Sequence, residues 1–299
     1  MSRVSIILPI YRSQATLAAC LAALNRQTYR DFEIVAVDSS PDEACAAIVQ
    51  QTPNTTYLRS QNRLLPHAAA NRALQVAGGE LLAFTDPDSY AHADWLEQLV
   101  RAHREGERVC VGAVECFGKR WLDLGAHLCK FDKWLSTGRP SRLQEGPTVN
   151  LLLSRKLLDR AGGRFHSDLH GDTDLCWRLA GMGVEIWSAP GAVVEHQHLH
   201  SWRSLLAERW ARGAGVADLR LSWKPMGPAA LCLRLMVTVL PLRLASQLWR
   251  VGRNAGRAGR WWIYLQTLPV VSSGLYSGLL GEAQTMLRHL LRLAGRPDE

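Results

Sequence analysis

The feature that most constrains this chain is an apolar run that ends abruptly in two carboxylates. Residues 81–85 carry no charge, and Asp86-Pro87-Asp88 follows them directly. Such a run is typical of a buried strand, and proline, which fixes φ and donates no hydrogen bond, suits a stiff turn at its end. Open α/β sheets bind ligands beyond the carboxyl ends of their strands, where two hard oxygen ligands suit Mg²⁺ or Mn²⁺. The stretch therefore indicates either a metal site that holds a diphosphate or an ordinary capped turn.

The residues before this turn alternate between strand-like and helix-like patterns. The strand-like runs span 4–9, 32–37 and 56–59, and the helix-like segments span about 17–24, 43–51 and 67–77. Because crossovers between parallel strands are right-handed, the carboxyl ends of such strands meet at one edge of a sheet. We therefore predict an α/β fold with a Rossmann-like, mostly parallel central sheet flanked by helices. The site should lie at that edge.

No glycine-rich phosphate loop accompanies the first strand. Neither Gly-x-Gly-x-x-Gly nor Gly-x-x-x-x-Gly-Lys-Ser/Thr follows it. This disfavours a dinucleotide site of the usual Rossmann type and a P-loop. The phosphates of a bound nucleotide would then be held by a metal ion and by side chains.

Two later segments carry further polar side chains. Asp172 lies at the expected start of a helix, where it is either a helix-stabilising carboxylate or a catalytic group. Three alternate histidines, at 196, 198 and 200, end a strand-like segment that begins near residue 192. On their own they fit a solvated strand face or a zinc site.

The ordered set of segments resembles the inverting family 2 glycosyltransferases, which have a GT-A fold. The resemblance covers about residues 3–215, and it is far more specific than any one motif. It rests on the stretch 4–11, the pair Asp38-Ser39, the helix segment 71–74, the run 79–84, and the pair Asp86 and Asp88.

The resemblance implies an activity and a set of site residues. A single sugar would pass from a nucleotide-diphosphate donor, which we expect to be UDP-linked, to a hydroxyl acceptor with inversion at the anomeric carbon. The cofactor would be Mg²⁺ or Mn²⁺. The donor would be bound by Pro9, Tyr11, Asp38 and Asp86, the metal by Asp88 and His196, and the acceptor proton would be taken by Asp172 as general base.

The chain departs from the family pattern at three places. The family often has Ala-Arg-Asn on the helix where this chain has Ala69-Ala70-Asn71, so Arg63 or Arg72 is expected to replace the usual arginine. Gly171 stands where a glutamate usually precedes the general base, and Asp174 is the fallback base. Leu206 occupies the glutamine position of the Gln-x-x-Arg-Trp motif of processive members, which favours transfer of one sugar only. Arg209 occupies the arginine position of the same motif and is expected to neutralise the charge of the leaving phosphate.

The positive charge of the chain lies in its last third. The net charge is +8, and residues 201–299 hold 14 Lys and Arg against 5 Asp and Glu. These cations are interleaved with two apolar stretches, 229–249 and 261–281, a pattern that favours an anionic membrane surface over nucleic acid. We therefore divide the chain into a catalytic domain at 1–215 and a helical, basic, apolar extension at 216–299.

The second apolar stretch has 21 residues without a charge, close to the length that crosses a bilayer, but proline and glycines weaken it. Two interpretations stay open: membrane attachment, or helices packed on the catalytic domain or in a dimer interface. Attachment to the inner face of the cell membrane is the expectation, with a cytoplasmic catalytic domain, because the chain begins without a signal-peptide pattern. Four arginines between the stretches would meet the headgroups: Arg250, Arg253, Arg257 and Arg260.

The acceptor is expected to be a glycan or a lipid-linked hydroxyl in cell-envelope synthesis. Two other function classes stay open. A sugar nucleotidyltransferase would normally show a glycine-rich basic loop near the N-terminus, which this chain lacks. A catalytically inactive, membrane-docked nucleotide-binding protein would explain Gly171 and the missing helix arginine. Seven scattered cysteines without a Cys-x-x-Cys pair indicate neither disulfides nor a zinc ribbon.

Overall fold

The computed structural model describes residues 3–106, 108–167, 169–198 and 201–294. The chain folds into two compact units. The first comprises residues 1–117 and 134–197, and the second comprises residues 118–133 and 198–299. The sequence placed a domain boundary at residue 215; in the structure this position lies inside helix α8 (Trp202–Trp223), which belongs wholly to the second unit.

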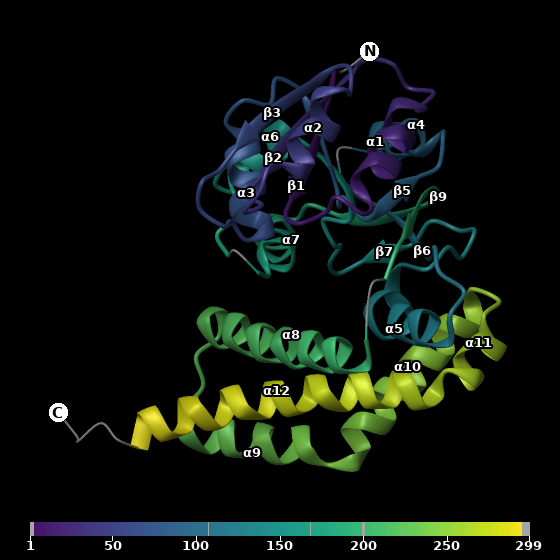
Figure 1. Cartoon of the computed structure of the whole chain (residues 1–299). Coiled ribbons are helices and arrows are strands. Elements are labelled where there is room, and N and C mark those ends of the chain that lie inside the picture. Colours follow the sequence, from purple (N-terminus) through teal and green to yellow (C-terminus); the bar gives the residue numbers. More distant parts are fainter. Residues whose placement is uncertain (1–2, 107, 168, 199–200, 295–299) are drawn as a thin grey trace. The chain divides into compact units, whose positions relative to one another are not determined.

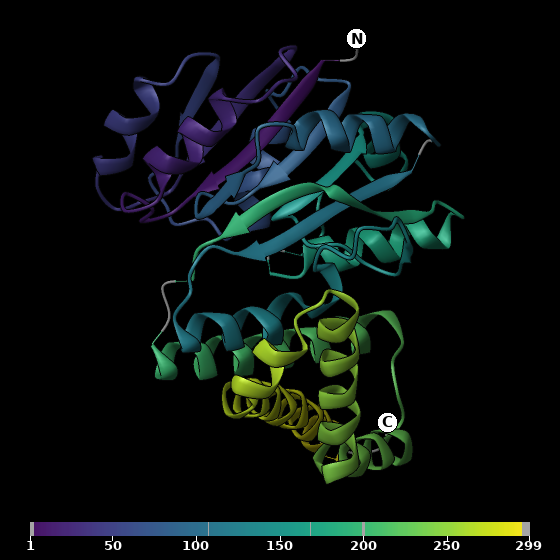
Figure 2. The ribbon, with the colours of Figure 1, turned by 90° about the vertical axis from the view of Figure 1, so that its right-hand side faces the viewer.

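The first unit is built on a twisted central sheet (Figure 1 and Figure 2). Within the described residues the strand order is β3-β2-β1-β4-β8-β6-β9-β5, and β7 also pairs with β9. Strands β1 to β4 are parallel, as the sequence predicts, whereas β8 runs antiparallel to β4 and β6. The strands are β1 Val4–Ile10, β2 Phe32–Asp38, β3 Thr55–Arg59, β4 Leu81–Thr85, β5 Ser89–Ala91, β6 Val109–Cys116, β7 Arg142–Leu143, β8 Asn150–Ser154 and β9 Ile186–His196.

Strand β1 is the centre of the parallel half. Ile6 lies between Ile34 of β2 and Ala83 of β4. Successive side chains of a strand point to opposite faces, yet Ile6, Ile7 and Leu8 are all fully buried. Both faces of the sheet are therefore covered, which explains why these strands read as unbroken apolar runs.

Helices of the first unit flank the sheet (Figure 1). Those before Asp86 fall where the sequence predicts them, to within a few residues at each end. Helix α3 begins at Pro66, a residue that suits the first helical turn because its missing N–H would have no partner there. The helices are α1 Leu17–Asn25, α2 Ala44–Gln50, α3 Pro66–Leu74, α4 Trp95–Arg104, α6 Arg155–Arg160 and α7 Gly171–Gly181.

The second unit is helical. Part of it, helix α5, comes from a segment between β6 and β7 for which no element is predicted above; the short 3₁₀ helix Asp132–Trp134 follows α5. The remaining helices follow the first unit in the chain. The helices of this unit are α5 Trp121–Phe131, α8 Trp202–Trp223, α9 Pro228–Val239, α10 Pro241–Arg257, α11 Trp261–Gln266 and α12 Leu268–Ala294.

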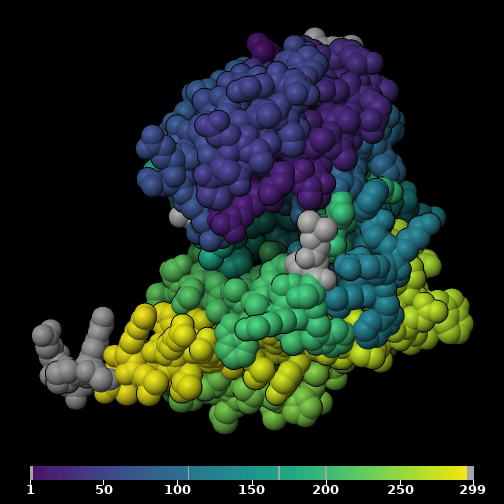
Figure 3. Space-filling model, in the orientation of Figure 1, coloured from purple at the N-terminus to yellow at the C-terminus, as the bar shows by residue number. Residues whose placement is uncertain are grey.

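Helices α8 and α12 lie side by side along most of their length (Figure 1 and Figure 3). Glycines allow this close approach: a Cβ atom at Gly213 would collide with the backbone of Gly278, and one at Gly281 would collide with the backbone of Trp210. The buried side chains Val271 and Leu275 belong to the same helix, α12. The apolar character of residues 261–281 is therefore largely explained by helix packing.

The same stretch is not one helix. Thr267 separates α11 from α12, and within the described residues no single helix is both long and apolar enough to cross a bilayer. Among the described helices, only α9 and α10 pass such a test together, and they are bent by 62° at Leu240. Exposed apolar side chains of the second unit occur in both apolar stretches: Leu233, Met236, Val239 and Leu242 in the first, and Trp261, Trp262 and Leu265 in the second.

Several arginines of the extension bind buried carboxylates. Arg220 donates to buried Glu282 of α12 at 3.2 Å, and Arg234 and Arg243 lie 3.6 Å and 3.9 Å from the same carboxylate. Arg250 donates to both carboxylate oxygens of buried Asp132 at 2.7 Å. The expectation that Arg250 meets lipid headgroups is therefore wrong, because its guanidinium is committed to this ion pair inside the unit.

Candidate active site

The parallel strands bring polar residues together at one edge of the sheet. Asp38 is the last residue of β2 and Arg59 the last of β3, and the two lie opposite each other in register. Tyr11 follows β1, and Asp86 follows β4, its parallel neighbour. This is the edge at which open α/β sheets bind ligands.

Asp86, Asp88 and His196 form one cluster. Each offers a ligand atom, and these atoms all lie within 4.8 Å of one another. His196 is the last residue of β9 and pairs with Ser89, which follows the Asp86-Pro87-Asp88 turn and opens β5. Its Nε2 atom lies 3.5 Å from Oδ1 of Asp88. Two segments that are distant in sequence, the Asp86-Pro87-Asp88 turn and the end of β9, therefore meet at this edge.

The surroundings of this cluster fit a divalent ion. Two carboxylates and one imidazole suit Mg²⁺ or Mn²⁺ in number and kind of donor. Two buried hydroxyl oxygens, Thr85 Oγ1 and Ser89 Oγ, flank the turn and have no hydrogen-bond partner among the described residues. Buried polar atoms nearly always form hydrogen bonds, so we expect these two hydroxyls to bond to a polar ligand.

Cys20 of α1 lies behind the turn, and its Sγ atom donates to the backbone oxygen of Asp86 at 3.5 Å. Burial, with the negative charges of Asp88 and Asp86, raises the pKa of the Cys20 thiol. The thiol therefore stays protonated and supports the turn without competing as a thiolate ligand.

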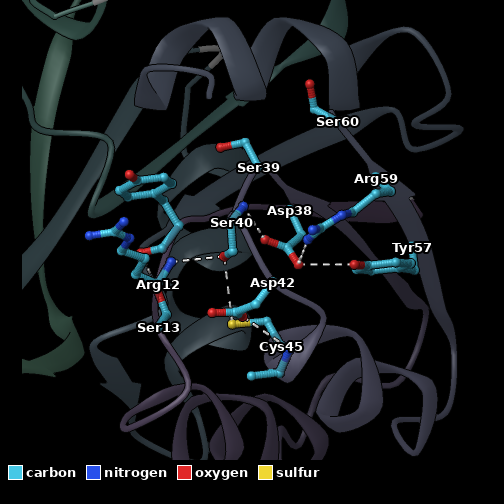
Figure 4. A network of polar contacts seen from close by, with 12 residues as sticks. Arg12, Ser13, Asp38, Ser39, Ser40, Asp42, Cys45, Tyr57, Arg59 and Ser60 are labelled. Carbon is cyan, nitrogen blue, oxygen red and sulfur yellow. Dashed lines mark hydrogen bonds and ion pairs between the residues drawn. The ribbon is translucent and has the colours of Figure 1, made fainter. Parts of the chain in front are cut away.

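Asp38 is enclosed in a network of donors (Figure 4). The carboxylate is fully buried. Its Oδ1 atom accepts a hydrogen bond from the backbone N–H of Ser40 at 2.8 Å. Its Oδ2 atom accepts two, from the Tyr57 hydroxyl at 2.9 Å and from Nη1 of Arg59 at 2.8 Å. Sequence reasoning identified Asp38 but missed Tyr57 and Arg59.

The two missed residues share one face of β3 because they are two positions apart. Burial, together with the hydrogen bond to Asp38 and its charge, raises the pKa of Tyr57 to about 12. Tyr57 is therefore a protonated donor at neutral pH. The Arg59 side chain is 30% exposed, whereas that of Asp38 is fully buried. Arg59 is thus a charged member of this network that a ligand can reach, and Tyr57 is half-buried.

The loop after β1 is held against the end of β2. The backbone N–H of Arg12 donates to the Ser40 hydroxyl at 2.8 Å, and Arg12 adopts the left-handed region with φ of 50°. Beside it, the guanidinium of Arg63 lies over the Tyr11 ring, 4.6 Å from its centroid. Of the two arginines expected to replace the missing helix arginine, Arg63 thus lies at Tyr11, whereas Arg72 is exposed in the last turn of α3.

Asp172 lies in the first turn of α7. It is buried, and its Oδ1 atom accepts a hydrogen bond from the backbone N–H of Thr173 at 2.8 Å. The fallback base, Asp174, instead forms an ion pair with Arg178 at 2.9 Å. Of the two carboxylates in this turn, Asp174 is thus committed to a salt bridge, and Asp172 remains the better candidate.

His67 was missed by sequence reasoning, and it positions the start of α7. Its Nδ1 atom accepts a hydrogen bond from the backbone N–H of Gly171 at 3.2 Å, and its Nε2 atom lies 3.3 Å from the Thr148 hydroxyl. Thr148 precedes β8, whose first residue, Asn150, pairs with Thr85 at the end of β4. A chain of contacts therefore links Asp172 to the edge that carries Asp86.

Steric constraints explain the glycine at position 171. A Cβ atom there would lie 2.9 Å from the His67 ring and 2.9 Å from Phe165. Asn71 fixes Phe165 in place, since its side-chain amide exchanges two hydrogen bonds with the Phe165 backbone, at 2.9 Å and 2.8 Å. The place where the resemblance leads one to expect a glutamate is filled by an imidazole and a phenyl ring.

The remaining predicted residues lie elsewhere. Pro9 is within β1, opposite Val37 of β2. Arg209 belongs to the second unit, where its side chain lies against Gly274 of α12, so its role toward a leaving phosphate stays a prediction. His198 Nε2 lies 3.1 Å from His127 Nδ1 in the second unit. His200 lies outside the described residues.

Comparison with known proteins identifies the family. The model of glycosyl transferase family 2 matches residues 5–158, which is half of the chain. Among curated proteins, the glycosyltransferase AglE of Haloferax volcanii is 25% identical over 271 residues, covering 85% of this chain and 88% of that protein.

Two solved structures share the fold. The mannosyltransferase PcManGT from Pyrobaculum calidifontis, in complex with GDP-Man and Mn²⁺, superposes with a TM-score of 0.56 at 21% identity, covering 90% of this chain and 86% of that chain. GalNAc-T7 with UDP, GalNAc and Mn²⁺ gives a TM-score of 0.55 at 15% identity, covering 66% of this chain and 43% of the larger one. With the central sheet and the matched motifs, these findings show that the chain belongs to glycosyl transferase family 2 and is a glycosyltransferase with the GT-A fold.

Proposed function

We propose that the protein transfers a single sugar from a UDP-linked donor to a hydroxyl acceptor, with inversion and with the help of Mg²⁺ or Mn²⁺. The observation that carries the proposal is the convergence of Asp86, Asp88 and His196 within 4.8 Å at the edge where β4 ends. A catalytically inactive protein has no need of this donor set or of a buried carboxylate at Asp172.

The chemistry divides between the ion and the side chains. Asp88 and His196 would hold the metal, which supplies electrostatic stabilisation for negative charge on the departing diphosphate. Asp172 takes the proton of the acceptor hydroxyl as general base. One base acting on an acceptor that attacks from the face opposite the leaving group gives inversion, and no carboxylate nucleophile is needed.

The donor is held from the strand ends. Tyr11 and Arg63 form a stacked pair after β1, and an arginine at that place suits recognition of phosphate. Asp86 is two residues from Asp88 and would contact the ribose, as the resemblance implies. GalNAc-T7 was solved with UDP and PcManGT with GDP-Man, so donors with a nucleoside diphosphate are compatible with this fold.

The acceptor side of the proposal rests on the second unit. We call the exposed apolar side chains of α9 to α11 the apolar helix surface; Leu242 and Trp262 are each 74% exposed. Between residues 219 and 281 the sequence holds eight Lys and Arg and no Asp or Glu. This surface comprises Leu233, Met236, Val237, Val239, Leu240, Leu242, Trp249, Trp261, Trp262 and Leu265.

Apolar and aromatic side chains flanked by cations are typical of an interface with anionic lipid. Lys224, Arg253 and Arg257 are exposed cations of the same segment. We therefore extend the proposal to peripheral attachment at the inner face of the cell membrane and to a lipid-linked or glycan acceptor in cell-envelope synthesis. A bent pair of helices that lies in the headgroup region fits this attachment.

The proposal is tested with purified protein and a panel of nucleotide sugars. Release of the nucleotide in the presence of vesicles that carry a polyprenyl-phosphate-linked acceptor is measured with and without Mn²⁺, for wild type, Asp88→Ala and Asp172→Asn. We expect metal-dependent turnover of the UDP-linked donor, lost in both variants, with donor binding kept in Asp172→Asn. Binding without turnover in wild type would support the inactive alternative.

A further inference from the structure

The network around Asp38 indicates that a residue other than Asp38 contacts the nucleobase of the donor. This inference rests on the proposed nucleotide-sugar donor. The resemblance implies that Asp38 accepts a hydrogen bond from the ring N–H of the base. In the structure the carboxylate has no exposed surface, and both oxygens already accept hydrogen bonds. Because the carboxylate is enclosed, a direct contact with the base would require one of the groups that cover it to move.

The exposed member of the network is a donor and not an acceptor. Arg59 donates from Nη1 to Asp38, and its guanidinium also interacts with the Tyr57 side chain. A guanidinium has five N–H donors in a fixed plane, so several remain for a ligand. Arg59 ends β3 beside the end of β2, on the edge that carries Tyr11 and Asp86.

Buried partners hold this guanidinium in one orientation. The ion pair with Asp38 joins adjacent strands at 2.8 Å, and the Tyr57 hydroxyl binds the same oxygen. Because Asp38 is fully enclosed, its charge is largely balanced by Arg59. What the network presents to a ligand is therefore a set of oriented N–H donors.

We propose that Arg59 recognises a keto oxygen of the nucleobase, and that Asp38 and Tyr57 are positioning residues for it. Uracil and guanine present such an oxygen, whereas cytosine and adenine present an amino group at the corresponding place. A donor facing an amino group leaves both groups unpaired, which is the basis of strong discrimination in polar sites. The site thus selects keto bases, and UDP and GDP are the two candidates.

Direct reading by Asp38 would also favour uracil over cytosine, so the preference alone does not distinguish the two arrangements. The variants do. If Asp38 reads the ring N–H, removal of Arg59 frees the carboxylate and keeps or increases the preference. If Arg59 reads the keto oxygen, its removal abolishes the preference.

The experiment is calorimetry of UDP, CDP, GDP and ADP in the presence of Mn²⁺, with wild type, Arg59→Ala, Arg59→Lys and Tyr57→Phe. Arg59→Lys keeps an ion pair with Asp38 and guards against the unfolding that an unpaired buried carboxylate would cause in Arg59→Ala. The matched control is Arg3→Ala, which removes a similar cross-strand ion pair, to Glu33 at 3.0 Å, at the opposite end of β1. Circular dichroism establishes that each variant is folded.

We expect wild type to bind UDP roughly 10- to 100-fold more tightly than CDP, the range of a hydrogen bond to a charged donor. In Arg59→Ala and Arg59→Lys the ratio should fall toward one through loss of UDP affinity, with CDP affinity unchanged. Arg3→Ala should keep the wild-type ratio. A merely structural role would lower the affinity for UDP and CDP alike, and that result overturns the inference.

The outcomes separate this inference from the proposed function. A wild-type ratio kept in folded Arg59→Lys overturns the role of Arg59 and leaves the glycosyltransferase proposal intact. Preferential binding of GDP that is lost in the Arg59 variants supports the role of Arg59 and overturns the UDP assignment. If wild type binds none of the four nucleotides, the donor site itself is wrong.

Discussion

The backbone amide of Gly171 donates a hydrogen bond to the imidazole of His67, 3.2 Å away, and the same imidazole occupies the space that a side chain at 171 would need. The residue before the proposed base is thus a glycine because α3 and α7 approach closely there. A histidine from another helix, and not a neighbouring glutamate, therefore orients the first turn of α7.

The first prediction concerns Gly171. Restoring the family residue with Gly171→Glu should lower the free energy of unfolding by about 1–3 kcal/mol, since the side chain forces apart a packed site. Gly171→Ala should show a smaller loss of the same sign. The measurement is urea unfolding. The control is Gly181→Ala at the end of the same helix, where an added Cβ meets nothing within 4 Å and helix propensity favours alanine. An unchanged unfolding midpoint in Gly171→Glu would contradict the packing described here.

The second prediction concerns the ionisation of Tyr57. Its pKa is raised from 10.0 to about 12, so the folded protein holds the proton more tightly than the unfolded chain. The resulting stability is fully present below pH 10 and is lost as the pH rises through 12. Ultraviolet titration of phenolate in wild type minus Tyr57→Phe should show one tyrosine that ionises near pH 12. A difference curve centred near pH 10 would show that Tyr57 is neither buried nor in contact with Asp38 as described.

The third prediction concerns the apolar helix surface. Leu242→Asp should reduce binding to vesicles that contain anionic lipid by about tenfold or more, because burial of a leucine side chain contributes about 1.5–3 kcal/mol. Vesicle sedimentation measures the bound fraction. Val76→Asp, at an exposed valine of the first unit, should bind as wild type does. If wild type ignores vesicles and Leu242→Asp instead dissociates a dimer in sedimentation velocity, the surface is a protein interface.

The fourth prediction concerns the glycines between α8 and α12. Gly213→Ala should destabilise the protein by about 1–3 kcal/mol, although alanine favours helix, because its Cβ would collide with the backbone of Gly278. Gly256→Ala in α10 is the matched control, since the nearest atom to its added Cβ is 3.9 Å away. Equal stability of the two variants in thermal unfolding would mean that the helices do not approach this closely.

Much of the fold follows from local sequence patterns. The parallel strands are buried on both faces, so Ile6, Ile7 and Leu8 read as one apolar run, and the helices between the strands show their own period. The antiparallel strand β8 could not be given a direction, because an apolar run does not record which neighbour it pairs with. The helix α5 was missed because its segment packs within the second unit, against partners that are distant in sequence.

The candidate site was predicted where residue type and position along a strand suffice. Asp86 and Asp88 follow a strand directly, and His196 ends one, so their convergence could be expected. Arg59, Tyr57 and His67 could not be recognised in the same way, because their roles depend on cross-strand register and on helix packing. The register of β3 beside β2 was the signal available: two polar residues on one face, next to the end of a strand that carries an aspartate.

In the extension, the sequence favoured a membrane-facing segment where the structure shows helix packing. Residues 261–281 have the length and composition of a membrane span, but the burial of Val271 and Leu275 and the glycine contacts with α8 explain that composition. Arg250 was expected to meet headgroups, and Arg234 and Arg243 lie in the first apolar stretch; all three instead pair with the buried carboxylates Glu282 and Asp132. Composition alone does not distinguish a helix that faces lipid from one that faces a neighbouring helix.

The most direct test of the central claim is calorimetry of UDP binding with and without Mn²⁺, in wild type, in Asp88→Ala, and in the control Asp31→Ala, an exposed carboxylate just before β2. We predict UDP binding that requires Mn²⁺, that is lost in Asp88→Ala and that is unchanged in Asp31→Ala. If folded wild-type protein binds UDP equally well without metal, or if Asp88→Ala binds as wild type does, Asp88 does not hold a metal for the donor and the proposed mechanism is wrong.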